Sequence, residues 1–113
     1  MNINSEISFN PNLRVAPLGV IAMEGAKELG DKINDYLMEW AIPEHRPEKS
    51  FLIESDCPRF SSGDGKGLIK QTIRGDDLFI IVDVGNYNCK YKMFGEENSM
   101  SPDDHYQDLK RII

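Results

Sequence analysis

The feature that most constrains the fold is the run 78–82 (LFIIV), the most apolar stretch of the chain. β-Branched and aromatic residues over this length are typical of a buried strand. The segment 74–77 (RGDD) directly before it predicts a tight turn. Residues 68–73 indicate an extended segment, and the glycines of 63–65 indicate a hairpin turn before it. Because a buried strand needs partners on both edges, we expect the other elements to pack around 78–82.

A strand, helix, strand order precedes this region. Residues 18–23 (LGVIAM) and 51–54 (FLIE) are short apolar runs, typical of strands. Between them, residues 24–40 carry apolar side chains at helical spacing, namely Ala26, Leu29, Ile33, Tyr36, Leu37 and Trp40. This order predicts parallel strands with a right-handed crossover. We therefore expect an α/β fold with a mixed, mostly parallel sheet, flanking helices and a protruding hairpin.

Two further segments follow the apolar run. Residues 85–99 are polar with scattered aromatic side chains, for which a loop pinned by its own apolar residues is favoured over a binding surface. Residues 101–104 (SPDD) predict a helix start, with serine at the cap and proline in the first turn. The helix ends on two isoleucines without a glycine cap, so we expect a truncated domain. The predicted organisation is a flexible arm over 1–17 and a partial domain over 18–113.

The composition argues against several classes of binding partner. The net charge of −6 argues against a broad nucleic-acid surface and against an anionic membrane. No apolar run approaches the roughly 20 residues of a membrane span, and the N-terminus lacks a secretory pattern. Cys57 and Cys89 lie in unrelated contexts, so no disulfide is expected and a cytoplasmic location is favoured. His45 and His105 are expected to be solvated rather than to bind metal.

Three local motifs could carry chemistry. The glycine-rich segment 61–67 (SSGDGKG) could hold phosphate, but its spacing fits no phosphate-binding motif and favours a hairpin turn. Two pairs of aspartates, 76–77 and 103–104, have adequate structural causes in a turn and a helix cap. Asp83 is the better functional candidate, because ligands of open α/β sheets gather at the carboxyl ends of strands. These observations alone predict an α/β domain without a defined function.

Two segments together suggest a family. Residues 59–64 (RFSSGD) and 72–81 (TIRGDDLFII) resemble the N-terminal domain of ribose-phosphate pyrophosphokinase, also called phosphoribosyl pyrophosphate synthetase. That family carries a pattern like RFS-D-G-E followed by SVRG-x-DVFII at the same spacing. The helices expected over 24–37 and from Ser101 resemble the first helices of its phosphoribosyltransferase-like fold.

The resemblance implies a function. Enzymes of this family transfer diphosphate from ATP to ribose 5-phosphate, with Mg²⁺, and assemble as homo-oligomers. It implies that Phe60 stacks on the adenine of ATP across a subunit contact, with Ser62 and Asp64 beside the base. It also implies that Thr72 and Arg74 bind an allosteric phosphate. The family's catalytic residues and metal ligands lie beyond the positions of this chain, so neither is expected here, and the chain alone is expected to be inactive.

Departures from the family pattern leave alternatives open. Ser62 stands where the family has an acid or amide, and Asp64 is shorter than the family's glutamate. Gly65 and Gly67 replace apolar positions and are expected to loosen the hairpin. A non-catalytic regulatory relative and an unrelated α/β interaction domain are therefore kept beside the enzyme.

Overall fold

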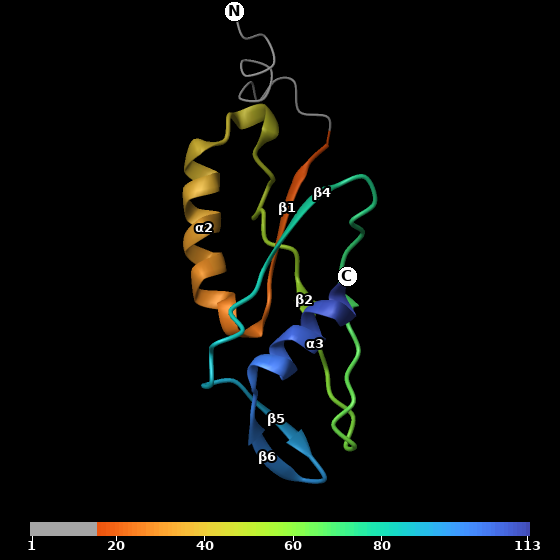
Figure 1. Cartoon of the computed structure of the whole chain (residues 1–113). Coiled ribbons are helices and arrows are strands. Elements are labelled where there is room, and N and C mark those ends of the chain that lie inside the picture. Colours follow the sequence, from red (N-terminus) through yellow and green to blue (C-terminus); the bar gives the residue numbers. More distant parts are fainter. Residues whose placement is uncertain (1–15) are drawn as a thin grey trace, which may run out of the picture.

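The computed structural model describes residues 16–113 (Figure 1). In chain order its elements are β1 (Leu18–Ala22), the 3-10 turn η2 (Glu24–Ala26), α2 (Lys27–Trp40), the 3-10 turn η3 (Pro43–His45), β2 (Ser55–Asp56), β3 (Leu68–Ile69), β4 (Asp77–Ile81), β5 (Lys90–Met93), β6 (Glu96–Ser99) and α3 (Pro102–Ile112). The predicted mixture of helices and strands is confirmed. The predicted arm 1–17 lies outside the described residues except for its last two positions.

β1 is the central strand of the described residues. It pairs in parallel with β4, in a register that sets Val20 opposite Phe79. On its other edge Val20 forms a parallel bridge to Leu52, with hydrogen bonds from Val20 N to Phe51 O (2.9 Å) and from Ile53 N to Val20 O (2.8 Å). The predicted parallel relation of the segments 18–23 and 51–54 is therefore confirmed. The remaining ladders, β2–β3 and β5–β6, are antiparallel.

The prediction that 78–82 is the most buried strand is wrong for the described residues. β4 pairs only with β1 among residues 16–113, and Phe79 in its middle is 57% exposed. The extended segment before it pairs with β2 rather than with β4. β1 is the strand with neighbours on both edges, and Val20, Ile21 and Ala22 are correspondingly buried.

Helix α2 covers one face of β1 through small residues. A Cβ added at Gly30 would lie 2.5 Å from the Cβ of Ala22, so glycine permits the close approach. This contact turns the predicted apolar stripe partly outward, and that prediction is wrong at Leu29, Tyr36 and Trp40, which are exposed. The side chains nearest the sheet belong to the line that runs through Ala26 and Gly30.

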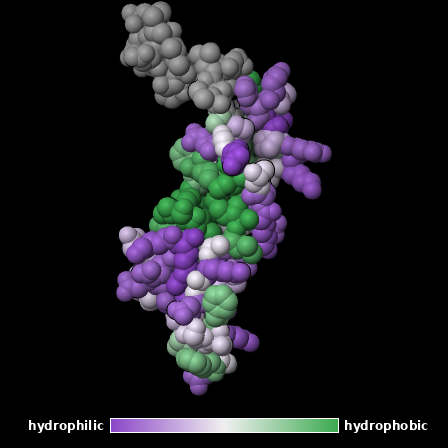
Figure 2. All heavy atoms as spheres, turned by 90° about the vertical axis from the view of Figure 1, so that its right-hand side faces the viewer, coloured by the Kyte–Doolittle hydropathy of each residue, from purple (hydrophilic) through white to green (hydrophobic). Residues whose placement is uncertain are grey.

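The opposite face of the sheet carries the core. Buried apolar side chains from β1, the 51–53 segment and α3 form one cluster, namely Ile21, Met23, Ile53 and Ile112. Partly buried apolar residues pack against it, namely Cys57, Ile69, Ile73, Leu78, Ile80 and Val82. Figure 2 shows an apolar surface across the middle of one face of the molecule. Neither α-helix of residues 16–113 combines the length and apolar character needed to cross a membrane.

The segment 85–99 was expected to be a loop, and this expectation is wrong over its second part, 90–99. Residues 90–99 form the β5–β6 hairpin, in which Tyr91 faces Asn98 across the ladder. The hairpin turns at Phe94 and Gly95, which have φ angles of 52° and 83°. Alternation of polar and apolar residues in β5 (KYKM) is a strand signal that the polar composition of the segment obscured.

The predicted start of α3 is confirmed. Ser101 Oγ accepts a hydrogen bond from Asp104 N (3.2 Å), and Ser101 N donates to Asp104 Oδ2 (2.9 Å), which is a capping box. The buried face differs from the predicted apolar stripe, since Tyr106 is exposed while His105 and Asp108 are buried. The expectation that His105 is solvated is wrong, because its Nε2 lies 2.6 Å from Asn86 O and its side chain is 2% exposed.

Candidate functional site

The hairpin between β2 and β3 ends in a short turn, residues 60–64, here called the Phe60 turn. Arg59 and Gly65 bridge at its base. Phe60 N donates to Asp64 O (2.7 Å), and Gly63 N donates to Phe60 O (2.9 Å). Gly63 has a φ of 94°, in the region that favours glycine. The glycine-rich segment is thus a hairpin turn, as predicted.

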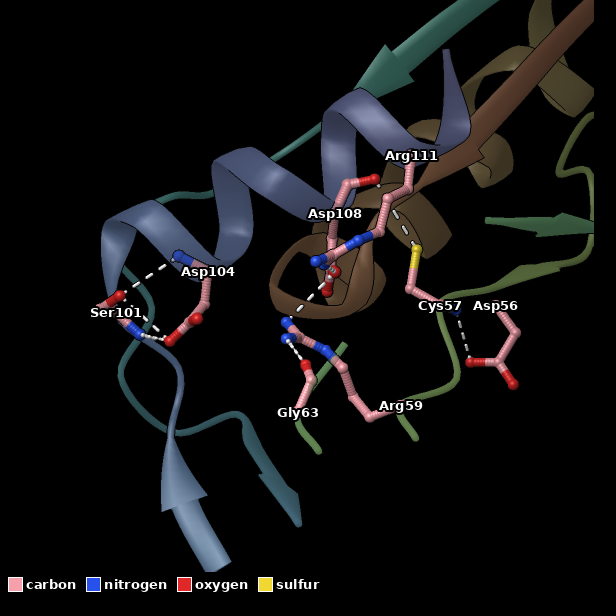
Figure 3. Close-up of polar contacts among 8 residues, drawn as sticks. All are labelled: Asp56, Cys57, Arg59, Gly63, Ser101, Asp104, Asp108 and Arg111. Carbon is pink, nitrogen blue, oxygen red and sulfur yellow. Dashed lines mark hydrogen bonds and ion pairs between the residues drawn. The ribbon is translucent and has the colours of Figure 1, made fainter. Parts of the chain in front are cut away.

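One arginine ties this turn to two other elements (Figure 3). Arg59 Nη1 donates to Gly63 O (2.9 Å), and Arg59 Nη2 lies 3.2 Å from Asp108 Oδ1 of α3. The guanidinium also lies 4.5 Å from the ring centroid of Tyr91 in β5, a cation–π contact. The Arg59 and Asp108 side chains are only 10% and 7% exposed. The ion pair is therefore buried. The Arg59 guanidinium contacts the Phe60 turn, β5 and α3 at once.

Asp108 is the centre of a wider polar cluster. The same carboxylate oxygen accepts from Arg111 Nη1, one helical turn away. Asp108 thus has two cations beside one carboxylate. Arg59 Nη2 is close enough to Asp108 for an ion pair, but it has no hydrogen-bond partner among the described residues. The cluster holds its groups at fixed positions because each lost partner would leave a charge away from water.

Neither cysteine is prepared to act as a nucleophile. Cys57 Sγ lies 3.8 Å from the backbone oxygen of Asp108. Burial first, and then the charges of Asp108 and Asp56, raise the pKa of the Cys57 thiol to about 11. Burial also raises the pKa of Cys89. Because the thiolate is the reactive form, a raised pKa lowers the reactivity of both thiols near neutral pH.

Two glycines that depart from the family pattern have a structural cause. A Cβ at Gly67 would overlap the backbone carbonyl group of Arg111, and a Cβ at Gly65 would lie 3.1 Å from Arg59 Cδ and 3.2 Å from Arg111 Nη1. The hairpin therefore lies directly against the last turn of α3. The expectation that these glycines loosen the hairpin is wrong, since they permit close packing.

The three residues predicted to contact ATP lie together on the Phe60 turn. The Phe60 ring is 56% exposed. Ser62 and Asp64 are exposed beside it, and Ser62 Oγ donates to Asp64 Oδ2 (3.2 Å). An aromatic face and two small polar groups are thus presented by one rigidly held turn.

The two residues predicted to bind an allosteric phosphate lie elsewhere. Thr72 and Arg74 are exposed in the loop before β4, and Gly75 supports that turn with a φ of 80°. The loop adjoins the start of β1, since Asp77 N donates to Pro17 O (2.7 Å). Arg74 forms no ion pair with another described residue. The predicted nucleotide and phosphate residues therefore form two separate groups.

A groove of about 360 Å³ adjoins the Phe60 turn. Its lining residues come from η2, the β2–β3 hairpin, β5, the link between β6 and α3, and α3, namely Glu24, Asp56, Cys57, Arg59, Lys90, Tyr91, Lys92, Met100 and Asp108. Three cationic side chains there face three carboxylates, and Arg59 is already paired with Asp108. Because the charges balance, the groove by itself does not favour a phosphate.

Metal binding finds no support in the described part of the chain. Within residues 16–113 no three His, Cys, Asp or Glu side chains gather so that they could hold a metal ion. Asp83, the carboxylate favoured by position, accepts from Gly85 N (3.0 Å) through Oδ1, which is an ordinary turn contact.

The residues of α3 and β5 that support the Phe60 turn were not predicted from the sequence. Asp108, Arg111 and Tyr91 hold the Phe60 turn, yet none of them stood out in the sequence. A charged pair at Asp108 and Arg111 is an i,i+3 pattern that usually indicates an exposed helix face. Only the distant partner Arg59 distinguishes this pair from a surface one.

No protein-family model matches the chain, and no curated protein or solved structure matches it significantly. The resemblance to ribose-phosphate pyrophosphokinase is carried by residues 59–64 and 72–81 alone.

Proposed function

We propose that the chain supplies the adenine contact of a ribose-phosphate diphosphokinase, an enzyme that transfers diphosphate from ATP to ribose 5-phosphate. The observation that carries the proposal is the exposed Phe60 ring on a turn that buried ion pairs hold in place. Here the contacts of Arg59 fix the backbone and leave the ring available.

The energetics suit a purine base. Stacking of a base on an aromatic side chain contributes roughly 1–3 kcal/mol. The turn is already ordered by Arg59, so little conformational entropy is lost when a base docks on it. Both effects favour a planar ligand over a flexible one.

Neighbouring polar groups can bind the edge of a purine base. The Asp64 carboxylate accepts hydrogen bonds only, and the Ser62 hydroxyl can donate or accept. Adenine presents an exocyclic amine that donates. In the proposal, Asp64 accepts from this amine.

The rest of the reaction lies outside the residues described. Phosphoryl transfer depends on positioning and on neutralisation of charge, and the balanced groove offers no surplus of cations for it. In the proposal the described residues hold the base, while a second copy of the protein holds the phosphates, ribose 5-phosphate and Mg²⁺. The acidic composition argues against nucleic acid and anionic membranes as partners. In the proposal, the protein is a cytoplasmic homo-oligomer, as the family resemblance implies.

Binding of ATP to the intact protein tests the proposal. F60A should weaken ATP binding roughly 5- to 150-fold, measured by titration calorimetry, because it removes the stacking face. F79A is the matched control, since Phe79 is exposed to the same extent but lies on β4. Equal affinity in F60A and the wild type would contradict the proposal.

A non-catalytic relative is the second candidate, motivated by Ser62 in place of an acid or amide. Such a protein would bind ATP through the Phe60 turn and form no phosphoribosyl pyrophosphate. Product formation from ATP and ribose 5-phosphate by the intact protein distinguishes the two candidates.

A further inference from the structure

The turn of the β5–β6 hairpin holds a residue that its backbone disfavours. Phe94 and Gly95 both have positive φ, the conformation of a two-residue hairpin turn that favours asparagine, aspartate or glycine at its first position. Phe94 is the sole non-glycine residue of the described chain with positive φ. Its ring is 76% exposed, so packing does not offset the strain. Residues held in such sparsely populated backbone conformations cluster at active sites and ligand clamps.

The strained residue lies beside the Phe60 turn. Phe94 N donates to Ser61 O (2.6 Å), one residue away from Phe60. A Cβ on Gly63 would lie 2.8 Å from Met93 Sδ, so the two tips are also packed together through side chains. In Figure 1 the β5–β6 hairpin and the tip of the 60–64 segment lie at the same end of the molecule. Two tips from distant parts of the chain, each with an exposed phenylalanine, therefore lie side by side.

We propose that Phe94 provides a second stacking ring for the same adenine base as Phe60. The inference rests on the proposed function and extends it to a residue that the resemblance does not cover. A purine is a broad two-ring system, and one phenyl ring covers only part of its face. A second exposed ring on a tip that is bonded to the first extends the aromatic surface in the place where the base is expected.

A single substitution separates this role from a structural one. Asparagine suits the left-handed backbone of Phe94, so F94N should keep or raise the melting temperature of the intact protein. It should also weaken ATP binding at least 5-fold, because the ring is lost. F94Y keeps both ring and backbone and should bind ATP like the wild type. If Phe94 had only a structural role, F94N would be at least as stable as the wild type and would bind ATP with the same affinity.

The matched control is Y87N, which removes an aromatic side chain of similar exposure (62%) in the turn before β5. It should leave ATP affinity unchanged. If F60A weakens ATP binding and F94N does not, the role of Phe94 is overturned while the proposed function stands. If neither variant weakens binding, both proposals fail. Loss of affinity in F94Y as well as F94N would also overturn stacking by Phe94.

Discussion

The two ends of this molecule are stabilised in different ways. Around β1, the fold depends on apolar burial, with Ile21 fully buried and α2 in contact through Gly30. Around the Phe60 turn, it depends on charged side chains that converge on Asp108. Side chains that stabilise a fold by apolar burial cannot contact a ligand, because they are buried. A charged cluster instead orders the backbone and leaves nearby aromatic rings exposed to solvent. The second arrangement is the one that can present aromatic groups to a ligand.

Removal of the central charge should give the largest effect. D108A leaves Arg59 buried without its counter-charge, and breaking a buried pair in this way costs about 3–5 kcal/mol. The loss is expected in the free energy of unfolding, measured by urea denaturation. ATP affinity should fall as well, because the Phe60 turn loses its anchor.

A double variant sharpens this result. R59M combined with D108L replaces the pair with apolar side chains, which is often close to neutral for stability. It should recover part of the lost stability, because Arg111 still lacks its partner Asp108. ATP binding should remain weak, since the contacts to Gly63 and Tyr91 are gone. If the double variant were as unstable as D108A, an unpaired buried charge would not explain the loss of stability in D108A.

A conservative change in the apolar end should have a smaller effect. I21V removes one buried methylene and should cost about 0.5–1.5 kcal/mol. Its ATP affinity should equal that of the wild type, because β1 does not contact the Phe60 turn through any hydrogen bond or ion pair between described residues. A loss of affinity larger than that of F60A would erase the distinction between the two ends.

The elements that the sequence predicted well are those with local causes. The cap at Ser101 and the turn at Gly63 depend on neighbours within a few residues, and both are confirmed. Strand pairing is not local, so the most apolar run was mistaken for the central strand although β1 holds that place. The prediction of the buried face of α2 was wrong for a related reason. The close approach of Gly30 to β1 decides which side of the helix packs on the sheet.

The candidate site was predictable in part. Residues 59–64 resemble the family pattern within six consecutive positions, so Phe60, Ser62 and Asp64 were predicted together. Its support was not predictable, because Arg59 meets Asp108 only after the chain has folded. Phe94 was missed for another reason, since the segment around it is polar and its strand alternation is short.

The most direct test is hydrogen exchange of the intact protein with and without saturating ATP. Slower exchange is expected in peptides that cover 59–65 and 90–95, because the base would restrain both tips. Exchange in β1 and α2 should not change. Unchanged exchange at 59–65 while ATP is bound, or protection confined to β1 and α2, would contradict the placement of the adenine at the Phe60 turn.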